Sequence, residues 1–334
     1  MMRRPGILHV WLAAGVAAAL TVGVAGGGQA PGAQRKPGYR APRTAWGHPD
    51  IHGDYTNKDE ANTPLERPQQ LAGKDAGAFT EADLAQLARE RAAAAQQIAG
   101  GIGGAETGAG PTHWYDHLRA RGSRPWFIID PPDGRLPAMT PQAQRREAAI
   151  ALLNNARNGE GRADSTDDRS MYDRCITRGL PGSMMPAIYG NAYQIVQAPD
   201  TIAIRYEMIH ETRIIPLGGR PHLGGGVREL MGDARGRFDG DTLVVETTNF
   251  TNRTHFGYNN RYNSAKLRLV ERFTPIGPGR LNWEVTVDDP EVWTHPWTFA
   301  MTLTRDDGQP VFEYACHEGN YGLLHILRGA RAED

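Results

Sequence analysis

Two His-Glu pairs are the residues whose types most directly suggest chemistry. One is His210-Glu211 in the stretch RYEMIHETR, and the other is His317-Glu318 in EYACHEGNYG. An imidazole titrates near neutral pH and a neighbouring carboxylate can orient it, so either pair suits general acid–base catalysis. Neither pair continues into the HExxH spacing of zinc proteases. We therefore expect metal-independent catalysis by His210, Glu211, His317 and Glu318.

The backbone that carries each pair restricts this chemistry. On a regular strand, adjacent side chains point to opposite faces, so each pair can act together only at a turn or a bulge. A regular strand would put Glu211 on one face with Arg205 and Arg213. That face is either a solvated surface of ion pairs or a polar barrel interior with a glutamate base and an arginine that holds an anion.

Four further residues are candidates for substrate binding. Arg178 lies in a Gly- and Pro-rich loop and can hold a ligand carboxylate. The structural alternative is that it pairs with a buried acid or caps backbone carbonyls. Arg213 can stabilise developing negative charge, and Tyr206 can donate a hydrogen bond. Trp297, in the stretch WTHPW, either stacks on a ligand or packs in the core.

The remaining histidines leave a metal site as an alternative. Three of them can meet at a barrel mouth and bind zinc or copper, or they can be ordinary turn residues. The candidates are His113, His117, His222, His255 and His295. The spacing of His113 and His117 suits one face of a helix, but Gly110-Pro111 just before them disfavours a helix there. We therefore expect no metal and no cofactor.

The two cysteines, Cys175 and Cys316, indicate a disulfide if the chain is exported. A free buried thiol or a nucleophile is the alternative. A bridge between them would bring Arg178 close to His317, so the disulfide would assemble one site from two distant stretches.

The N-terminus has the pattern of an export signal. Arg3 and Arg4 precede an apolar run over 7–25, and small residues follow near 26–30. This order predicts a cleaved signal peptide over residues 1–30 and a periplasmic or secreted protein, with an uncleaved membrane anchor as the alternative. A net charge of −1 does not favour nucleic acid or a membrane surface as a partner. A small-molecule ligand or substrate is the expected partner.

After the expected signal peptide, the chain divides into two parts, whose helices and strands carry the candidate residues. Residues 31–170 predict an extended arm and two helices, over 81–98 and 142–157, with Thr80 and Thr140 as N-caps. Residues 171–334 predict a β-barrel domain, because apolar residues there alternate with period two between short turns. The expected strands are 193–197, 201–209, 212–217, 235–238, 242–248, 267–275, 281–288, 297–305 and 310–315. A short helix over 321–328 closes the chain.

The turns between these runs favour a mainly β, antiparallel meander. Asp239-Gly240 is a strong hairpin signal. Closing the meander removes exposed edges, so we expect a lipocalin-like barrel with the arm and the two helices packed on it. Trp283 and Trp297 belong to large apolar faces that suit the inside of such a barrel.

Several stretches together resemble a family of exported bacterial proteins whose members look like lipocalin-like barrels. They are 63–68 (TPLERP), 173–175 (DRC), 213–216 (RIIP), 240–246 (GDTLVVE), 248–250 (TNF) and 316–321 (CHEGNY). The resemblance covers most of the chain after about residue 45. It implies that these polar stretches hold the family's site, and it carries no established activity over.

Three functions remain open on the sequence. The first is an exported enzyme of the lyase, isomerase or hydrolase kind, acting on a small organic substrate at the barrel mouth. The second is a non-catalytic periplasmic binding protein that carries an apolar or aromatic molecule inside the barrel. The third is an interaction module of the cell envelope that uses the arm as its contact segment.

Overall fold

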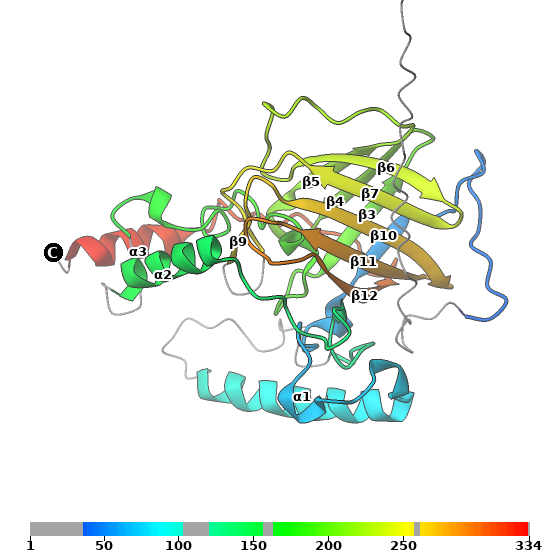
Figure 1. Cartoon of the computed structure of the whole chain (residues 1–334), viewed down its shortest axis with the longest axis horizontal. Coiled ribbons are helices and arrows are strands. Elements are labelled where there is room, and N and C mark those ends of the chain that lie inside the picture. Colours follow the sequence, from blue (N-terminus) through cyan, green and yellow to red (C-terminus); the bar gives the residue numbers. More distant parts are fainter. Residues whose placement is uncertain (1–35, 103–119, 156–162, 257–260, 333–334) are drawn as a thin grey trace, which may run out of the picture.

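The structure is a computed structural model and describes residues 36–102, 120–155, 163–256 and 261–332 (Figure 1). The expected signal peptide lies outside the described residues. At the centre is an antiparallel sheet that curls until it is nearly closed, with three helices around it. This confirms the mainly β, barrel-like fold class.

The sheet holds ten strands in the described part of the chain. Nine follow the order β5-β4-β3-β1-β12-β11-β10-β7-β6, and β2 pairs with β12 off this path. Their bounds are β1 Gly53–Thr56, β2 Ile128–Asp130, β3 Ala192–Gln197, β4 Thr201–Tyr206, β5 Thr212–Pro216, β6 Asp233–Asp239, β7 Thr242–Thr248, β10 Arg268–Gly277, β11 Arg280–Asp288 and β12 Trp297–Arg305. A separate two-stranded ribbon joins β8 His255–Phe256 to β9 Arg261–Tyr262.

Strand β1 joins two meanders into one sheet. It pairs with β3 on one side and with β12 on the other, although both follow it in sequence by more than a hundred residues. The expected strand over 310–315 is wrong: these residues form no strand. The physical reason is that β1 already occupies the backbone edge of β12 with which this segment would have paired.

Side chains fill the inside of the barrel. The inward faces of β11 and β12 bring Trp283, Trp297, Phe299 and Met301 into one core, and each of these is fully buried. Trp283 stacks with Phe273 of β10 at a ring-centroid distance of 6.3 Å. The large apolar faces read from the sequence therefore point inward, where they serve as packing.

A buried segment closes one end of the barrel. All eight residues from 179 to 186 are buried, and Leu180, Met184 and Met185 belong to the main core. Asn57, just after β1, donates from Nδ2 to the Met184 carbonyl oxygen at 2.7 Å. The second half of the Gly- and Pro-rich loop is therefore a plug, whereas the first half alternates buried residues such as Thr177 with exposed ones such as Ile176.

The helices are α1 Glu81–Ile102, α2 Pro141–Asn155 and α3 Tyr321–Ala332. The Thr80 hydroxyl accepts from the Asp83 amide at 3.2 Å, and the Thr140 hydroxyl accepts from the Ala143 amide at 3.1 Å. Both predicted N-caps are confirmed. No helix in the described residues has the length and apolar character to cross a membrane.

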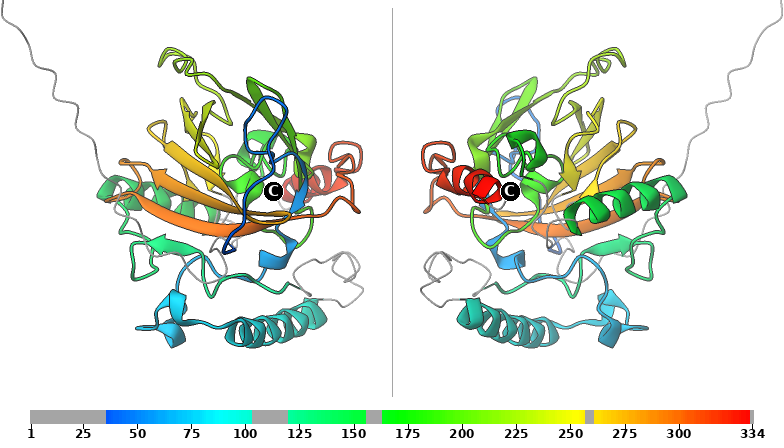
Figure 2. Two further views of the ribbon diagram at one scale, coloured as in Figure 1. Left: turned by 90° about the vertical axis from the view of Figure 1, so that its right-hand side faces the viewer. Right: turned by 90° about the vertical axis from the view of Figure 1, so that its left-hand side faces the viewer.

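A layer of chain separates α1 from the sheet. Figure 2 shows α1 below the edge-on sheet, with the segments before and after the helix between the two. Within this layer Phe127 accepts from the Ala300 amide at 3.0 Å and tethers the layer to β12. Because β1 and β2 come from residues 31–170, this region contributes strands to the sheet as well as covering it.

Candidate functional site

The expected disulfide is present and brings two distant stretches together. Cys175 and Cys316 are bonded, with their Cα atoms 5.7 Å apart across a sequence separation of 141. Asn320 strengthens the contact, because its Nδ2 donates to the Asp173 carbonyl oxygen at 2.8 Å. The prediction of a Cys175–Cys316 bridge is confirmed.

The first His-Glu pair lies in a tight turn between β4 and β5. A single-turn 3₁₀ helix over Met208–His210 joins the strands, and Ile209 has a positive φ of 65°. The side chain of His210 lies outside the described part of the structure. The Glu211 carboxylate accepts from the Thr177 hydroxyl at 2.7 Å, so it fixes the start of the plug segment.

This turn changes the expected strand faces. Arg205 pairs with Thr212, and Arg213 pairs with Ile204, which points into the core. The expectation that Arg205 and Arg213 share a face is wrong, because the chain turns between them and does not continue as one strand.

Arg213 and Tyr206 lie inside the barrel. Arg213 of β5 forms an ion pair of 2.5 Å with Glu271 of β10, and both side chains are buried. Trp283 Nε1 donates to the other Glu271 oxygen at 3.2 Å. Burial raises the pKa of Tyr206, and the facing Arg213 charge opposes this shift. These contacts cross the barrel interior, and a substrate-binding role for the two residues stays a prediction.

The other predicted site residues are divided between core and surface. Trp297 is fully buried between Trp293 and Phe299, with ring-centroid distances of 5.8 Å to each. His317 and Glu318 are both exposed beside the disulfide. The catalytic assignments therefore stay predictions: the structure holds the His317 pair near the Cys175 loop but does not enclose it.

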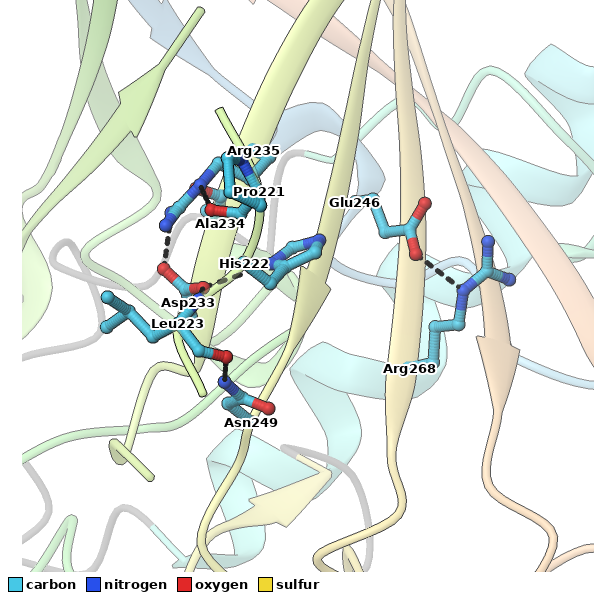
Figure 3. A network of polar contacts seen from close by, with 9 residues as sticks. All are labelled: Pro221, His222, Leu223, Asp233, Ala234, Arg235, Glu246, Asn249 and Arg268. Atoms are coloured by element: carbon cyan, nitrogen blue, oxygen red, sulfur yellow. Dashed lines mark hydrogen bonds and ion pairs between the residues drawn. The ribbon is translucent and has the colours of Figure 1, made fainter. Parts of the chain in front are cut away.

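A polar network on the outer face of β6, β7 and β10 is the clearest histidine constellation (Figure 3). His222 Nδ1 lies 3.1 Å from an Asp233 oxygen, which also accepts from the Leu223 amide at 2.8 Å. Burial raises the pKa of Asp233, but the Leu223 amide, His222 and Arg235 together lower it below its ordinary value. Glu246 pairs with Arg268 nearby at 2.9 Å. Each acid already has a cationic partner, so this network ties a loop to the sheet.

Metal-type ligands do not cluster in the described residues: no three His, Cys, Asp or Glu side chains come together there. The expectation of metal-independent chemistry remains a prediction.

A cleft of about 590 Å³ lies between the α1 layer and the outer face of β11 and β12. Phe79 and Leu84 form an apolar wall, and Thr302 of β12 lines the sheet side. This volume falls within the ~300–1,000 Å³ typical of small-molecule sites. We call it the Glu60 cleft, after the carboxyl group that lines it.

Glu60 is held at the cleft by its place just after β1. The chain leaves β1 through a 3₁₀ turn over Lys58–Glu60, and the Glu60 residue is only 1% exposed. Its Oε2 accepts from the Ser123 amide at 3.0 Å and from the Thr63 hydroxyl at 3.4 Å. Burial raises the pKa of Glu60, while Ser123, Arg124 and the Thr302 amide oppose the shift. The result is a buried carboxyl group that holds its proton more tightly than a free glutamate does.

Arg124 lies beside this carboxyl group and is 2% exposed. Its Nη2 donates to Asn282 Oδ1 of β11 at 3.1 Å. Nε and Nη1 have no hydrogen-bond partner within the described residues. Burial lowers the pKa of Arg124 to about 10, and the charges of Glu60 and Glu284 oppose this. A buried guanidinium with two unused donors is costly unless water or a ligand satisfies them.

Gly122 allows the cleft to form. It has a φ of +67°, and its amide donates to the Asp59 carbonyl oxygen at 2.5 Å. A Cβ there would lie 2.9 Å from the Thr63 hydroxyl oxygen. Only glycine therefore lets Ser123 approach Glu60 this closely.

Sequence reasoning missed Glu60, Arg124 and Ser123. They occur in stretches of no recognisable motif, DEANTP and RGSRPWF, within a region expected to be an arm. The one available signal was Arg124, two residues before the apolar run Trp126–Ile128, since a charge beside a buried strand needs a partner.

Comparison with known proteins adds no assignment. No protein-family model matches the chain, no curated protein matches it, and no solved structure matches it.

Proposed function

We propose that this is an exported protein that acts on a small organic molecule in the Glu60 cleft by acid–base chemistry. The observation that carries the proposal is a buried carboxyl group with a raised pKa, in a cleft of about 590 Å³. Perturbed acids in clefts are frequent at catalytic sites, because a proton-transfer group works best when its pKa approaches the working pH.

The surroundings of Glu60 suit transfer of a proton in either direction. The protonated carboxyl group can donate to a bound oxygen atom. The carboxylate left behind is then stabilised by the Ser123 amide, 3.0 Å from Oε2, and by the nearby charge of Arg124. Lyase, isomerase and hydrolase reactions all use such a step, so the proposal keeps this reaction class and moves the site from the barrel mouth to the outer face.

The export part of the proposal rests on the disulfide and the N-terminal pattern. A bridge between Cys175 and Cys316 is typical of proteins that fold in an oxidising compartment. The order of charge, apolar run and small residues before residue 31 supports a cleaved signal peptide and a periplasmic or secreted location.

A non-catalytic binding protein is the second candidate. The observation that favours it is the apolar wall of Phe79 and Leu84, which suits the body of an organic ligand. The fully buried side chains inside the barrel argue that such a ligand would also use the Glu60 cleft and not the lumen.

A turnover screen with matched variants tests the proposal. The purified protein would be incubated with a panel of small esters, lactones and hydroxy acids, and products followed by mass spectrometry. For any substrate found, we expect Glu60→Gln to lower kcat/KM by about 100-fold or more, the usual size of acid–base catalysis. Gln retains the acceptor for the Ser123 amide, so the variant should fold.

The matched control is Glu318→Gln at the exposed His-Glu pair, which should leave kcat/KM within about twofold of wild type. Loss of turnover in Glu318→Gln with retention in Glu60→Gln would place the chemistry at the disulfide end and contradict the proposal. Binding that depends on Glu60 without product formation would support the second candidate.

A further inference from the structure

A second polar cluster lies at the disulfide, apart from the residues that line the Glu60 cleft. Its centre is Arg178, on the first half of the loop, which precedes the plug. Arg178 Nη1 is buried and has no hydrogen-bond partner in the described residues, and no described carboxylate forms an ion pair with Arg178. An arginine commonly pairs with an acid or donates to backbone carbonyls. Neither role accounts for Arg178 Nη1.

Two tyrosines, Tyr172 and Tyr314, interact with this guanidinium, and a third, Tyr189, interacts with both of them. The Arg178 Cζ atom lies 5.6 Å from the ring centroid of Tyr172, within the range of a cation–π contact. Burial raises the pKa of both Tyr172 and Tyr314, and the Arg178 charge opposes the shift in each case. The Tyr189 hydroxyl interacts with both of these phenols. The phenols therefore stay neutral at physiological pH and keep their hydroxyl protons. The Tyr172 hydroxyl donates to Met208 Sδ at 3.7 Å, and because sulfur is a weak acceptor, a ligand oxygen can take its place.

The disulfide assembles this cluster from two parts of the chain. Tyr172 and Arg178 flank Cys175, whereas Tyr314 lies two residues before Cys316. The bridge holds the two backbones at a Cα–Cα distance of 5.7 Å. Without the disulfide, no backbone hydrogen bonds of a β-sheet would fix the position of Tyr314, because its segment forms no strand.

We propose that Arg178, Tyr172 and Tyr314 form a binding site for the carboxylate of a small organic acid, and that the Cys175–Cys316 disulfide assembles it. A guanidinium offers a planar fork of donors that matches the two oxygens of a carboxylate, and neighbouring phenols add further donors. Tyr172 as a residue is 40% exposed, and its ring can offer an apolar surface to the body of the acid. An aromatic acid therefore suits the site better than acetate does.

Titration calorimetry with benzoate, acetate and inorganic phosphate as probes tests this proposal. We expect the oxidised protein to bind benzoate at least about tenfold more tightly than acetate, because ring contact adds to the charge interaction. Arg178→Gln should weaken benzoate binding by at least about tenfold, in the range expected when a charge-assisted hydrogen bond is lost. Arg178→Lys should recover part of it. Preference for phosphate over benzoate would overturn the assignment to a carboxylate.

Matched variants separate the site from its neighbours. Arg174 is on the same loop but pairs with Asp167 at 2.9 Å, so Arg174→Gln should leave benzoate binding unchanged. Reduction of the disulfide under native conditions should weaken binding to the level of Arg178→Gln. Binding that survives both reduction and Arg178→Gln, or that is lost in Glu60→Gln alone, would overturn the proposal. Absence of benzoate binding at millimolar concentration would overturn it as well.

Discussion

Glu60 is the residue on which the proposed chemistry depends, and its pKa has a consequence for stability. Because burial raises this pKa, the folded protein holds the Glu60 proton more tightly than the unfolded chain does. Protonated Glu60 is therefore compatible with the fold, and ionised Glu60 is unfavourable. The unfavourable contribution is absent below the unfolded pKa, near about 4.3, and grows as the pH rises through the folded pKa.

Replacing Glu60 with Gln should remove this pH dependence. We expect Glu60→Gln to gain stability relative to wild type as the pH rises from about 4 to 8, since each unit of pKa shift is about 1.4 kcal/mol. Urea unfolding of both proteins across this range gives the difference directly. Exposed Glu318→Gln shows what the amide substitution does by itself. If the free energy of unfolding of the wild type instead increased relative to that of Glu60→Gln as the pH rises, Glu60 would prefer its ionised form in the folded protein.

At the scale of elements, one ion pair holds an edge strand across the barrel. β5 lies at one end of the strand order, and its Arg213 pairs with Glu271 of β10 on the far wall. Both charges are removed from water, so the loss of one leaves the other buried without compensation.

Glu271→Gln should therefore destabilise the protein by about 3–5 kcal/mol, the cost of breaking a buried pair from one side. The measurement is the urea midpoint of unfolding. The double variant Arg213→Met, Glu271→Gln should recover much of the loss, because no buried charge then remains unpaired. A loss in Glu271→Gln of less than about 1 kcal/mol would show that solvent reaches Arg213.

Strands and hairpins that depend on neighbouring residues alone were predicted correctly from the sequence. The alternation of Trp283 and its neighbours, and the Asp239-Gly240 turn, give β11 and the β6–β7 hairpin directly. The expected strand over 310–315 failed because pairing is decided by which edge is free, and β1 had taken that edge. The strand expected to run from 201 to 209 ended at Tyr206, because Ile209 adopts a left-handed backbone conformation that the residue type does not signal.

For the molecule as a whole, the disulfide is a covalent link between two segments 141 residues apart in sequence. The separation of 141 residues corresponds to about 5 kcal/mol of stabilisation in the chain-entropy model. Replacing both Cys175 and Cys316 with Ser should lower the free energy of unfolding by an amount of this order. The measurement is urea unfolding of the double variant beside the oxidised wild type. An unchanged midpoint would contradict a structural role for the bridge.

The barrel was predictable from sequence, but the Glu60 cleft was not. The barrel follows from period-two patterns that each need only a few neighbouring residues. The cleft needs Glu60, the Gly122–Arg124 segment and Thr302 to converge, and these come from three separate parts of the chain. Their meeting depends on the insertion of β1 beside β12, a long-range pairing with no sequence signature of its own.

An NMR titration of the Glu60 side-chain carboxyl carbon, assigned by comparison with Glu60→Gln, measures directly whether this group can transfer a proton near neutral pH. We predict a midpoint above the ordinary glutamate value of about 4.3. Arg124→Met should raise the midpoint further, because the Arg124 charge opposes the shift. A wild-type midpoint at or below the ordinary value would show a solvated carboxylate at this position and would contradict the account of Glu60 as a proton-transfer group.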